Sequence, residues 1–436
     1  MGQTMVEKIL ARNMGVSAVK PGDIVTVNVD RVMLDDIMIP FIVDKFHEMG
    51  FKKVWDPDKV VLIYDHLVPA SQQDDTRHYR VGDAFVKECG LIHVHRSDGI
   101  CHQLMTEAGY VKPGDVVLGT DSHTTTYGCV GAFSTGIGYT EMASILGTGT
   151  LWVKVPETIR VVIDGKLPGG VMSKDVILRL IGDLGADGAT YRALEFAGST
   201  VEEMSVSSRM TMANMAIEAG AKCAVFMPDE KTLKYCEESE KNYGGNGSQT
   251  FAMSLEQAER ELRADEDAVY LRTITYRAED FQPVMACPSQ VDNICSVSQL
   301  EGTAIDQVFI GSCTNGRLED LKAAASVLEG KKVAPFVKLI VTPASRKVYE
   351  DALDCGVLQT LIKAGAIITH PGCGLCCGRT GGILSDGERV VATNNRNFLG
   401  RMGTSKVEIY LASPMTAAAC AVAGRIVPAG GLPHEV

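Results

Sequence analysis

The chain has 436 residues, which is too long for one hydrophobic core and predicts two to four domains of roughly 150 residues each. Lys and Arg number 42 against 54 Asp and Glu, a net charge of −12, so the overall field repels polyanions and excludes nucleic acid as the main partner. No apolar run approaches the roughly 20 residues of a membrane span. A small acidic substrate stays compatible with this charge, because a few buried arginines can set the local potential.

The first 15 residues predict a helix and contain both acidic and basic side chains. They show no hydrophobic stretch before a small-residue cleavage site, so we expect a cytoplasmic protein without a signal peptide. Further along, β-branched runs alternate with helical patterns, which indicates parallel sheets of the α/β class. The segments that predict a strand, a polar or glycine-bearing turn and often a helix are 60–69, 114–128, 306–321, 337–353, 364–374 and 406–424. In the last of these, Ser413 is the expected N-cap and Pro414 the first helical residue.

We expect three doubly wound α/β domains, over residues 1–156, 157–284 and 285–436. The polar region 238–293 is expected to form surface excursions and a linker. Ligands of doubly wound sheets bind outside the carboxyl ends of the strands. Because every candidate motif follows a predicted strand, the sequence predicts functional residues at these strand ends.

Three cysteines stand where an apolar run breaks into a glycine-rich turn: Cys313, Cys373 and Cys376. Three thiolates without an obvious fourth predict a metal centre with one open coordination position. The alternatives are a zinc site completed by His370, a redox pair and small core residues, and the spacing favours a cluster slightly over zinc. The odd total of 13 cysteines favours reduced thiols over disulfides. We expect Cys377 and the remaining cysteines to be packing residues.

Three histidines stand beside polar residues at predicted strand ends: His66 after Asp65, His102 in GICHQ, and His123 close to Asp121. A carboxylate near an imidazole fixes its tautomer and raises its pKa, as a proton donor working near neutral pH requires. For any one of them a buried structural histidine is an equal alternative, but three together favour an acid–base site. Among the other histidines, His93 and His95 are ambiguous, and His47, His78 and His434 are expected at the surface.

Two further polar groups are candidates. Asn214 and Glu218 lie four residues apart on a predicted helix and so share a face; the pattern alone favours a solvent-facing Glu218 over a buried acid. Arg396 and Arg401 follow a strand and a run of asparagines that includes Asn395. Arginine pairs with carboxylates through two parallel hydrogen bonds, so these two are favoured as anchors of an acidic substrate over surface arginines.

In order and spacing, several motifs resemble the aconitase superfamily: YDHLVP, GICHQ, GTDSHTTTYG, GSCTNGR, the glycine-flanked C-x-x-C and TNNRNFLGR. The likeness extends from GQTMVEKIL to SPMTAAACAVAG and is greatest to the large subunits of the two-subunit branch, such as 3-isopropylmalate dehydratase and homoaconitase of the archaeal type. It implies three aconitase-like domains around a central [4Fe-4S] cluster held by Cys313, Cys373 and Cys376. One iron would lack a cysteine and act as a Lewis acid toward a hydroxy acid.

The resemblance also implies roles for the polar residues. His66, His102 and His123 match the active-site histidines of the family, with Asp65, Asp121 and Glu218 as their carboxylate partners. Of the three histidines, we expect His66 to protonate the departing hydroxyl. Asn395 matches a cluster-adjacent residue. Substrate-binding positions match Asp35 (a departure from the glutamine of aconitase), Ser122, Asn214, Arg396 and Arg401. The implied reaction removes water from a malate-type acid and adds it back at the neighbouring carbon.

A partner is implied as well. The Ser-Ser-Arg-Glu-His run of the family's swivelling fourth domain is missing from the sequence, so a small subunit would supply the serine base and the specificity loop. Isopropylmalate in leucine biosynthesis is the expected substrate, with homoaconitase, citramalate and 2,3-dimethylmalate dehydratase as alternatives. Two other classes are an RNA-binding regulator, which the acidic charge disfavours, and a zinc-stabilised protein without enzymatic activity.

Overall fold

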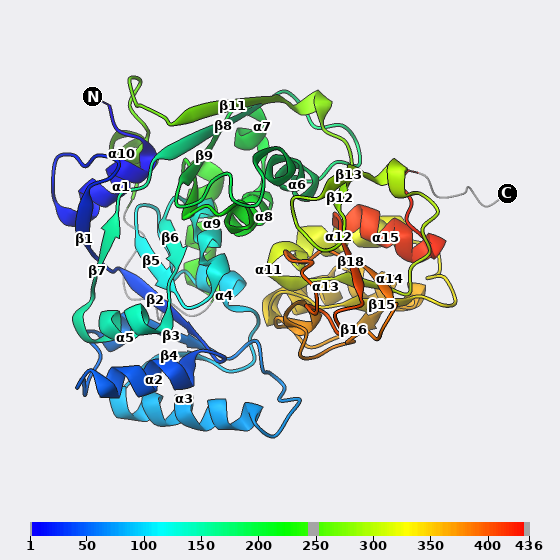
Figure 1. Ribbon diagram of the computed structural model, residues 1–436, viewed down its shortest axis with the longest axis horizontal. Helices are drawn as coiled ribbons and strands as arrows, with labels where there is room; N and C mark the ends of the chain where they lie inside the picture. Colours follow the sequence, from blue (N-terminus) through cyan, green and yellow to red (C-terminus); the bar gives the residue numbers. More distant parts are fainter. Residues whose placement is uncertain (1, 243–252, 431–436) are drawn as a thin grey trace. The chain divides into compact units, whose positions relative to one another are not determined.

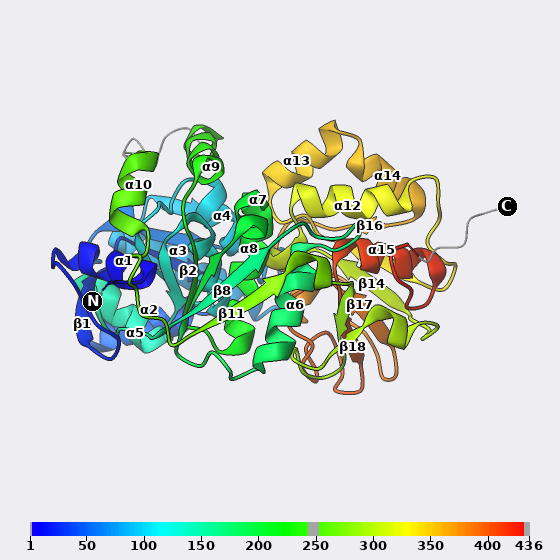
Figure 2. The same ribbon diagram turned by 90° about the horizontal axis from the view of Figure 1, so that it is seen from above.

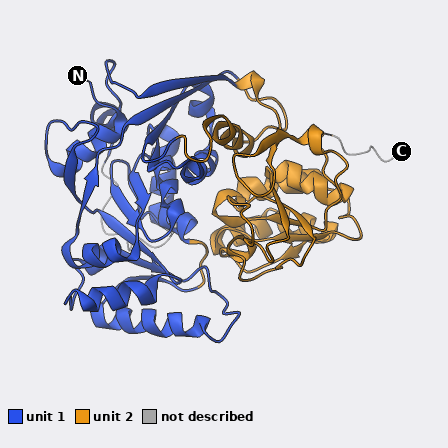
Figure 3. Ribbon diagram, in the orientation of Figure 1, with its two compact units in different colours: residues 1–96, 101–165, 189–277 blue, residues 97–100, 166–188, 278–436 orange. Residues whose placement is uncertain are grey.

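The computed structural model describes residues 2–242 and 253–430, and the chain divides into two compact units (Figure 1, Figure 3). Unit 1 comprises residues 1–96, 101–165 and 189–277, and unit 2 comprises residues 97–100, 166–188 and 278–436. Both units are built from α-helices and mainly parallel sheets, which confirms the predicted α/β class. Among the described residues, no helix is both long enough and apolar enough to cross a membrane.

The first sheet of unit 1 has five parallel strands in the order β4-β3-β2-β5-β6. They are β4 (His93–His95), β3 (Val60–Ile63), β2 (Arg31–Asp35), β5 (Val116–Gly119) and β6 (Phe133–Gly136). An apolar core on one face joins the sheet to α2 (Ile39–Glu48), α3 (Asp75–Cys89) and α5 (Tyr139–Thr148). Within it the rings of Phe46 and Phe85 meet edge to face at 5.3 Å. From β2 the chain first adds β3 and β4 on one side of the sheet, and it then adds β5 and β6 on the other side of β2. The strand order therefore reverses between β2 and β5.

The second sheet of unit 1 has four parallel strands in the order β10-β9-β8-β11. They are β10 (Cys223–Phe226), β9 (Ala193–Ala197), β8 (Thr158–Asp164) and β11 (Arg272–Arg277). Nearby helices are α1 (Met5–Met14), α7 (Ser199–Glu203), α8 (Val206–Met215), α9 (Glu230–Asn242) and α10 (Leu255–Leu262), and a separate antiparallel pair joins β1 (Ile24–Asn28) to β7 (Thr150–Lys154). Helices α1 and α10 pack against each other (Figure 2). A capping box of Thr4 and Glu7 begins α1.

Unit 2 contains a seven-stranded sheet in the order β13-β12-β18-β17-β14-β15-β16. Its strands are β13 (Ile294–Ser296), β12 (Val284–Ala286), β18 (Glu408–Leu411), β17 (Arg389–Ala392), β14 (Gln307–Ile310), β15 (Lys338–Val341) and β16 (Ile367–Ile368). All pairings from β18 to β16 are parallel, and those of β12 are antiparallel. Its longer helices are α6 (Ser173–Leu184), α12 (Leu318–Leu328), α13 (Arg346–Asp354), α14 (Val357–Ala364) and α15 (Pro414–Ala423). The strand order reverses here between β14 and β17.

The predicted strand–turn segments all contain a strand of these sheets, and α15 begins at Pro414 with Ser413 as its N-cap, as predicted. The three larger sheets occupy residues 31–136, 158–277 and 284–411; the boundaries at 156 and 284 stay a prediction. The polar region 238–293 is predicted to form surface excursions and a linker. Its described residues include the last residues of α9 and the whole of α10, β11 and β12. Part of that region, residues 243–252, lies outside the described residues.

A glycine in unit 1 supports a test of the packing between β10 and the 3₁₀ segment η2 (Ser122–Val130). A Cβ at Gly128 would lie 1.6 Å from the carbonyl oxygen of Ala224 on β10. We expect Gly128→Ala to lower the free energy of unfolding by about 1–3 kcal/mol or more, because the backbone must move apart. Urea denaturation measures the change. Gly169→Ala is the control, since a Cβ there meets nothing within 4 Å, and equal midpoints for the two variants would contradict the packing described.

Candidate active site

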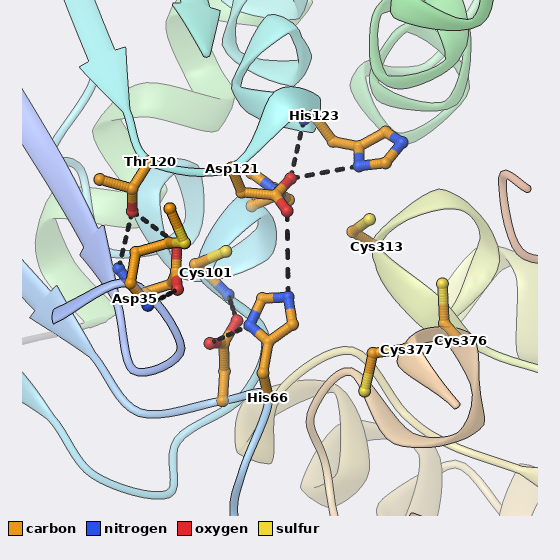
Figure 4. A network of polar contacts seen from close by, with 12 residues as sticks. Asp35, His66, Cys101, Thr120, Asp121, His123, Cys313, Cys376 and Cys377 are labelled. Atoms are coloured by element: carbon orange, nitrogen blue, oxygen red, sulfur yellow. Dashed lines mark hydrogen bonds and ion pairs between the residues drawn. The ribbon is translucent and has the colours of Figure 1, made fainter. Parts of the chain in front are cut away.

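Polar residues of unit 1 gather at the carboxyl ends of the parallel strands of its five-stranded sheet (Figure 4). Asp35 ends β2, Asp65 and His66 follow β3, and Asp121 follows β5. Because the strands are parallel, their carboxyl ends lie at one edge, and the strand order reverses between β2 and β5, where ligands of doubly wound sheets bind. Thr120, which follows β5, connects the ends of β5 and β2, because its Oγ1 donates to Asp35 Oδ2 at 2.5 Å.

The carboxylate of Asp121 joins two histidines. Its Oδ1 lies 2.7 Å from Nε2 of His102 and 3.1 Å from Nδ1 of His123. On the far side, Nε2 of His123 lies 2.9 Å from Oε1 of Glu218. Burial raises the pKa of Asp121, but the hydrogen bonds and charges of the two imidazoles outweigh it and hold this pKa well below its ordinary value. Asp121 therefore stays ionised and orients both rings.

His66 is buried among carboxylates. Its Nδ1 lies 2.7 Å from Oδ1 of Asp65, and its Nε2 lies 4.0 Å from Oδ2 of Asp121. Burial alone lowers the pKa of His66, yet Asp65, with smaller contributions from Asp35 and Asp36, raises it well above the ordinary value. Near neutral pH the imidazole therefore keeps its second proton, which is the state that a general acid needs.

Asp36 is a buried carboxylate that the sequence reasoning missed. It accepts the backbone N–H groups of His66 at 3.1 Å and Leu67 at 2.9 Å, which holds the turn after β3. Burial and the neighbouring Asp65 raise the pKa of Asp36 to about 8. The sequence signal for Asp36 is the pair of adjacent aspartates in RVMLDD, of which the sequence analysis gives only Asp35 a role. Asp35 is itself buried and accepts the backbone N–H of Met38 at 2.9 Å.

The expectation that Asn214 and Glu218 lie on one helix is wrong. Helix α8 ends at Met215, and Glu218 lies in the 3₁₀ turn η3 (Ala216–Ala219) that ends at a left-handed Gly220. Glu218 is only 6% exposed, so the solvent-facing interpretation is wrong as well. Asn214 is fully buried and donates to Oγ1 of Thr126 at 2.9 Å. Glu218 contacts His123, and Asn214 contacts Thr126. Both of these partners belong to η2, so helical spacing could not reveal them.

The remaining polar residues of unit 1 divide by burial. Ser122 begins η2 and is half-buried at the same edge as Asp121. His93 and His95 are buried and hydrogen-bonded to a carboxylate and a phenol of neighbouring residues, which marks them as structural. His47 and His78 are predicted to lie at the surface. His47 is exposed, whereas His78 is half-buried, with its Nδ1 2.9 Å from the backbone carbonyl oxygen of Asp36. The third predicted surface histidine, His434, lies outside the described residues.

The predicted cysteine ligands lie in unit 2, at the carboxyl ends of β14 and β16. Cys313 is in the short helix α11 (Ser312–Asn315), and Cys373 and Cys376 flank and occupy the 3₁₀ turn η6 (Gly374–Cys377). All three are buried, with at most 4% of each residue exposed. Asn395, which follows β17, connects the two segments: its Nδ2 lies 3.5 Å from Sγ of Cys313, and its Oδ1 lies 3.6 Å from Sγ of Cys376. The reversal between β14 and β17 thus brings Cys313 and Asn395 together.

A buried lysine and a half-buried arginine accompany these thiols. Lys174 in the first turn of α6 is fully buried, and its Nζ donates to the backbone oxygens of Thr393 at 2.8 Å and Asn394 at 2.6 Å. Burial lowers the pKa of Lys174 to about 7, against the opposing effect of Cys376 and other anionic groups. Nη2 of Arg401 lies 4.0 Å from Sγ of Cys376. Burial alone would lower the pKa of Arg401, and the thiols of Cys376 and Cys373 raise it.

Lys174 was not predicted from the sequence, where it stands as a single charge in the helical pattern VMSKDVIL. Its partners are main-chain oxygens 219 and 220 residues away, so no local signal could have identified them. Arg396 is half-buried, with its guanidinium 5.9 Å from the ring of Phe398.

The donor set fits a cluster better than a single ion. One tetrahedral zinc ion at about 2.3 Å from each sulfur needs its thiolates close together. In the described chain, the trios of ligand atoms within 4.8 Å of one another are His102 with Asp121 and His123, and Asp35 with Asp36 and His66; the three cysteines do not form such a trio. His370, the fourth ligand of the zinc alternative, is exposed. The buried Lys174 and the half-buried Arg401 beside Cys376 suit an anionic cluster, because buried charges require compensation.

Comparison with known proteins identifies the family. The model of the aconitase family (aconitate hydratase) matches residues 7–302 and 297–424. The chain is 51% identical over 427 residues to 3-isopropylmalate dehydratase large subunit 1 of Methanopyrus kandleri, with 98% of each chain covered. It is 44% identical to a probable methanogen homoaconitase large subunit of Methanothermobacter thermautotrophicus, with 97% of this chain and 96% of that one covered. The chain therefore belongs to the aconitase family.

A further relative is 3-isopropylmalate dehydratase large subunit 1 of Thermotoga maritima, 48% identical with 98% of each chain covered. Among solved structures, the holo form of aconitase X of Thermococcus kodakaraensis aligns with 85% of this chain at 15% identity, 84% of that chain and a TM-score of 0.49. The predicted resemblance is confirmed, and with it the expectation of a hydro-lyase family whose members carry a [4Fe-4S] cluster. The individual roles of the site residues stay predictions.

The raised pKa of His66 has a testable consequence. We expect Asp65→Asn to lower this pKa, because the largest favourable charge beside the imidazolium is lost. Because the pKa of His66 is raised in the folded state, protonation of this ring stabilises the fold. This stabilisation is fully present below the unfolded-state pKa of about 6.5 and is lost as the pH rises through the folded-state pKa. The ring proton signals of His66, followed by NMR against pH, measure the shift. Asp58→Asn, beside His93, is the matched control; a His66 titration that Asp65→Asn leaves unchanged would contradict the electrostatic account.

Proposed function

We propose that the chain is the cluster-bearing large subunit of a two-subunit hydro-lyase that converts 2-isopropylmalate to 3-isopropylmalate. The observation that carries the proposal is the 51% identity to a 3-isopropylmalate dehydratase large subunit over 98% of both chains. The relative named as a homoaconitase large subunit, at 44% identity, supports homoaconitase as the second candidate. Citramalate and 2,3-dimethylmalate are alternative substrates within the same reaction class.

Cys313, Cys373 and Cys376 would hold the cluster, leaving one iron without a cysteine ligand. When bound, the cluster supplies Lewis acidity toward the hydroxyl and carboxylate oxygens of the substrate. The contacts of Asn395 with two of the three sulfurs support this assignment, because such a side chain fixes the orientation of the thiolates that it touches. Lys174 holds the backbone at Thr393 and Asn394, and so positions the loop to which Asn395 belongs.

His66 is the proposed donor of the proton that converts the departing hydroxide to water. Its contact with Asp65 keeps the imidazolium charged and turns its Nε2 away from that carboxylate. The ionised Asp121, held between His102 and His123, keeps an anion close to the imidazolium and restricts both rings. Such a fixed arrangement lowers the cost of reorganisation when charge moves during the reaction.

Substrate recognition is assigned to residues that can meet carboxylates. Arg396 and Arg401 follow β17, and each can bind a carboxylate through two parallel N–H bonds. Ser122, half-buried beside Asp121, is proposed to contact the substrate as well. Asp35 and Asn214 are also proposed to contribute to substrate binding. Asp35 is hydrogen-bonded to Thr120, and Asn214 to Thr126. We therefore expect both residues to contribute by fixing the end of β5 and the segment η2.

The relatives are named as large subunits, which implies a small subunit as partner. We propose that this partner carries the swivelling domain of the family and supplies the serine base and the specificity loop, since the sequence contains no Ser-Ser-Arg-Glu-His run. A cytoplasmic location belongs to the same proposal.

We expect the purified chain, loaded anaerobically with its cluster, to turn over isopropylmalate at less than about one hundredth of the rate reached with its small subunit, because removing a general base typically costs 10²–10⁴-fold. Absorbance of the unsaturated acid that forms when water is eliminated measures the rate. Homocitrate, citramalate and 2,3-dimethylmalate are assayed in parallel to rank the substrates. Full turnover by the single chain would contradict the need for a partner, and failure with every acid in the complex would contradict the proposed reaction.

The ligand assignment is tested by exchanging neighbouring cysteines. We expect Cys376→Ser to lose most of the roughly four irons and the acid-labile sulfide of the cluster, whereas Cys377→Ser, whose sulfur contacts the backbone oxygen of Gly374, keeps them. Iron, sulfide and zinc analysis of both variants provides the measurement. One zinc ion per chain in the unchanged protein, without sulfide, would overturn the cluster in favour of the structural zinc alternative.

A further inference from the structure

Two cysteines of unit 2 that the proposed reaction does not use lie side by side. The Sγ atoms of Cys287 and Cys295 are 3.2 Å apart. Cys295 is on β13 opposite Met285 of β12, and the backbone N–H of Cys287 donates to the carbonyl oxygen of Asn293 at 2.7 Å. Residues 285 and 287 lie on one face of the strand, because side chains alternate. Both thiols therefore extend from the same face of one antiparallel hairpin, at diagonal positions.

The pair is within reach of small molecules. Both cysteines are half-buried, and Cys295 lines a cavity of about 300 Å³ together with Arg179, Asp183, Asp292 and Ser296. Because Cys295 lines this polar cavity and is only half-buried, a small polar reagent can reach this residue. By contrast, the proposed cluster ligands are buried, and the exposed Cys355 has its Sγ near a backbone oxygen of its own helix.

The hairpin is connected to the loop after β17. Nδ2 of Asn397 donates to the backbone oxygens of Cys287 at 2.7 Å and Gln290 at 3.2 Å. Asn397 is two residues after Asn395, the side chain that contacts the sulfurs of Cys313 and Cys376. A covalent link at the base of the hairpin would restrain the turn that anchors this loop.

We propose that Cys287 and Cys295 form a reversible dithiol–disulfide pair, which a small-molecule disulfide such as oxidised glutathione converts into an intrachain disulfide bond. This inference rests on the hairpin alone and does not depend on the substrate or cofactor proposed above.

The reaction is a pair of thiol–disulfide exchanges. The thiolate of Cys295, the residue of the pair that lines the cavity, attacks one sulfur of oxidised glutathione, forms a mixed disulfide and releases one glutathione thiolate. The thiolate of Cys287 then attacks the sulfur of Cys295, and the second glutathione leaves. The two cysteines lose two protons and two electrons, and the reagent disulfide is reduced to two thiols.

The order of attack agrees with the surroundings of Cys287. Burial raises its pKa to about 12, and the hydrogen bond and charge of Cys295 contribute to that rise. Once Cys295 is capped as a mixed disulfide, its charge is gone, so deprotonation of Cys287 becomes easier in the second step.

The experiment treats the full chain, kept free of oxygen, with oxidised glutathione, stops exchange with acid, and alkylates the remaining thiols after denaturation. Cleavage before aspartate separates the relevant cysteines into peptides 280–291, 292–305 and 306–319. We expect the first two to be joined by a disulfide that a reductant removes. The count of free thiols should fall by two from the 13 of the sequence.

Two variants keep the test specific. Cys295→Ser should abolish the linked peptide, and Cys355→Ser, which removes an exposed single thiol, should leave its yield unchanged. If peptides 280–291 and 292–305 are recovered separately, with both cysteines alkylated to the same extent as in the reduced protein, the proposal is overturned. A link from either peptide to 306–319, which contains Cys313, would overturn it as well.

Discussion

Parallel strand pairing with a reversal of strand order is the constraint on which the candidate functional residues of each unit depend. In unit 1 the reversal lies between β2 and β5, and in unit 2 it lies between β14 and β17. Parallel strands end at a common edge, and neighbouring crossovers that leave in opposite directions keep that edge open. Polar side chains can therefore collect there while the faces of the sheets stay apolar. Asp35 and Asp121 use the first reversal, and Cys313 and Asn395 use the second.

Burial of charge at these edges makes each partner necessary. A buried ion is costly unless it is paired or hydrogen-bonded, and the arrangement of Asp121 between two imidazoles meets that need in unit 1. In unit 2, Lys174 donates to two carbonyl oxygens and accompanies the thiols. The same contacts that compensate these charges also restrict the side chains, so the chemistry proposed for each group begins from a preorganised state.

Sequence reasoning succeeded where the end of a strand dictates the position of a residue. Asp65 and Cys313 follow uninterrupted apolar runs, which predict buried parallel strands, and both are found at the expected carboxyl ends. It failed at Glu218, because a regular helical spacing does not reveal that α8 ends at Met215 and tightens into a 3₁₀ turn. It also missed Lys174, since a single lysine in a helical pattern is ordinarily a solvated residue.

The sequence by itself determined the class of fold, the strand edges and the kinds of functional group at each edge, because these follow from local patterns of apolar and polar residues. Only the tertiary structure decided which groups meet. His123 contacts Glu218 across 95 positions of the chain, and Asn395 contacts Cys313 across 82. Such contacts depend on how the strands are ordered in each sheet, and strand order results from packing between distant segments.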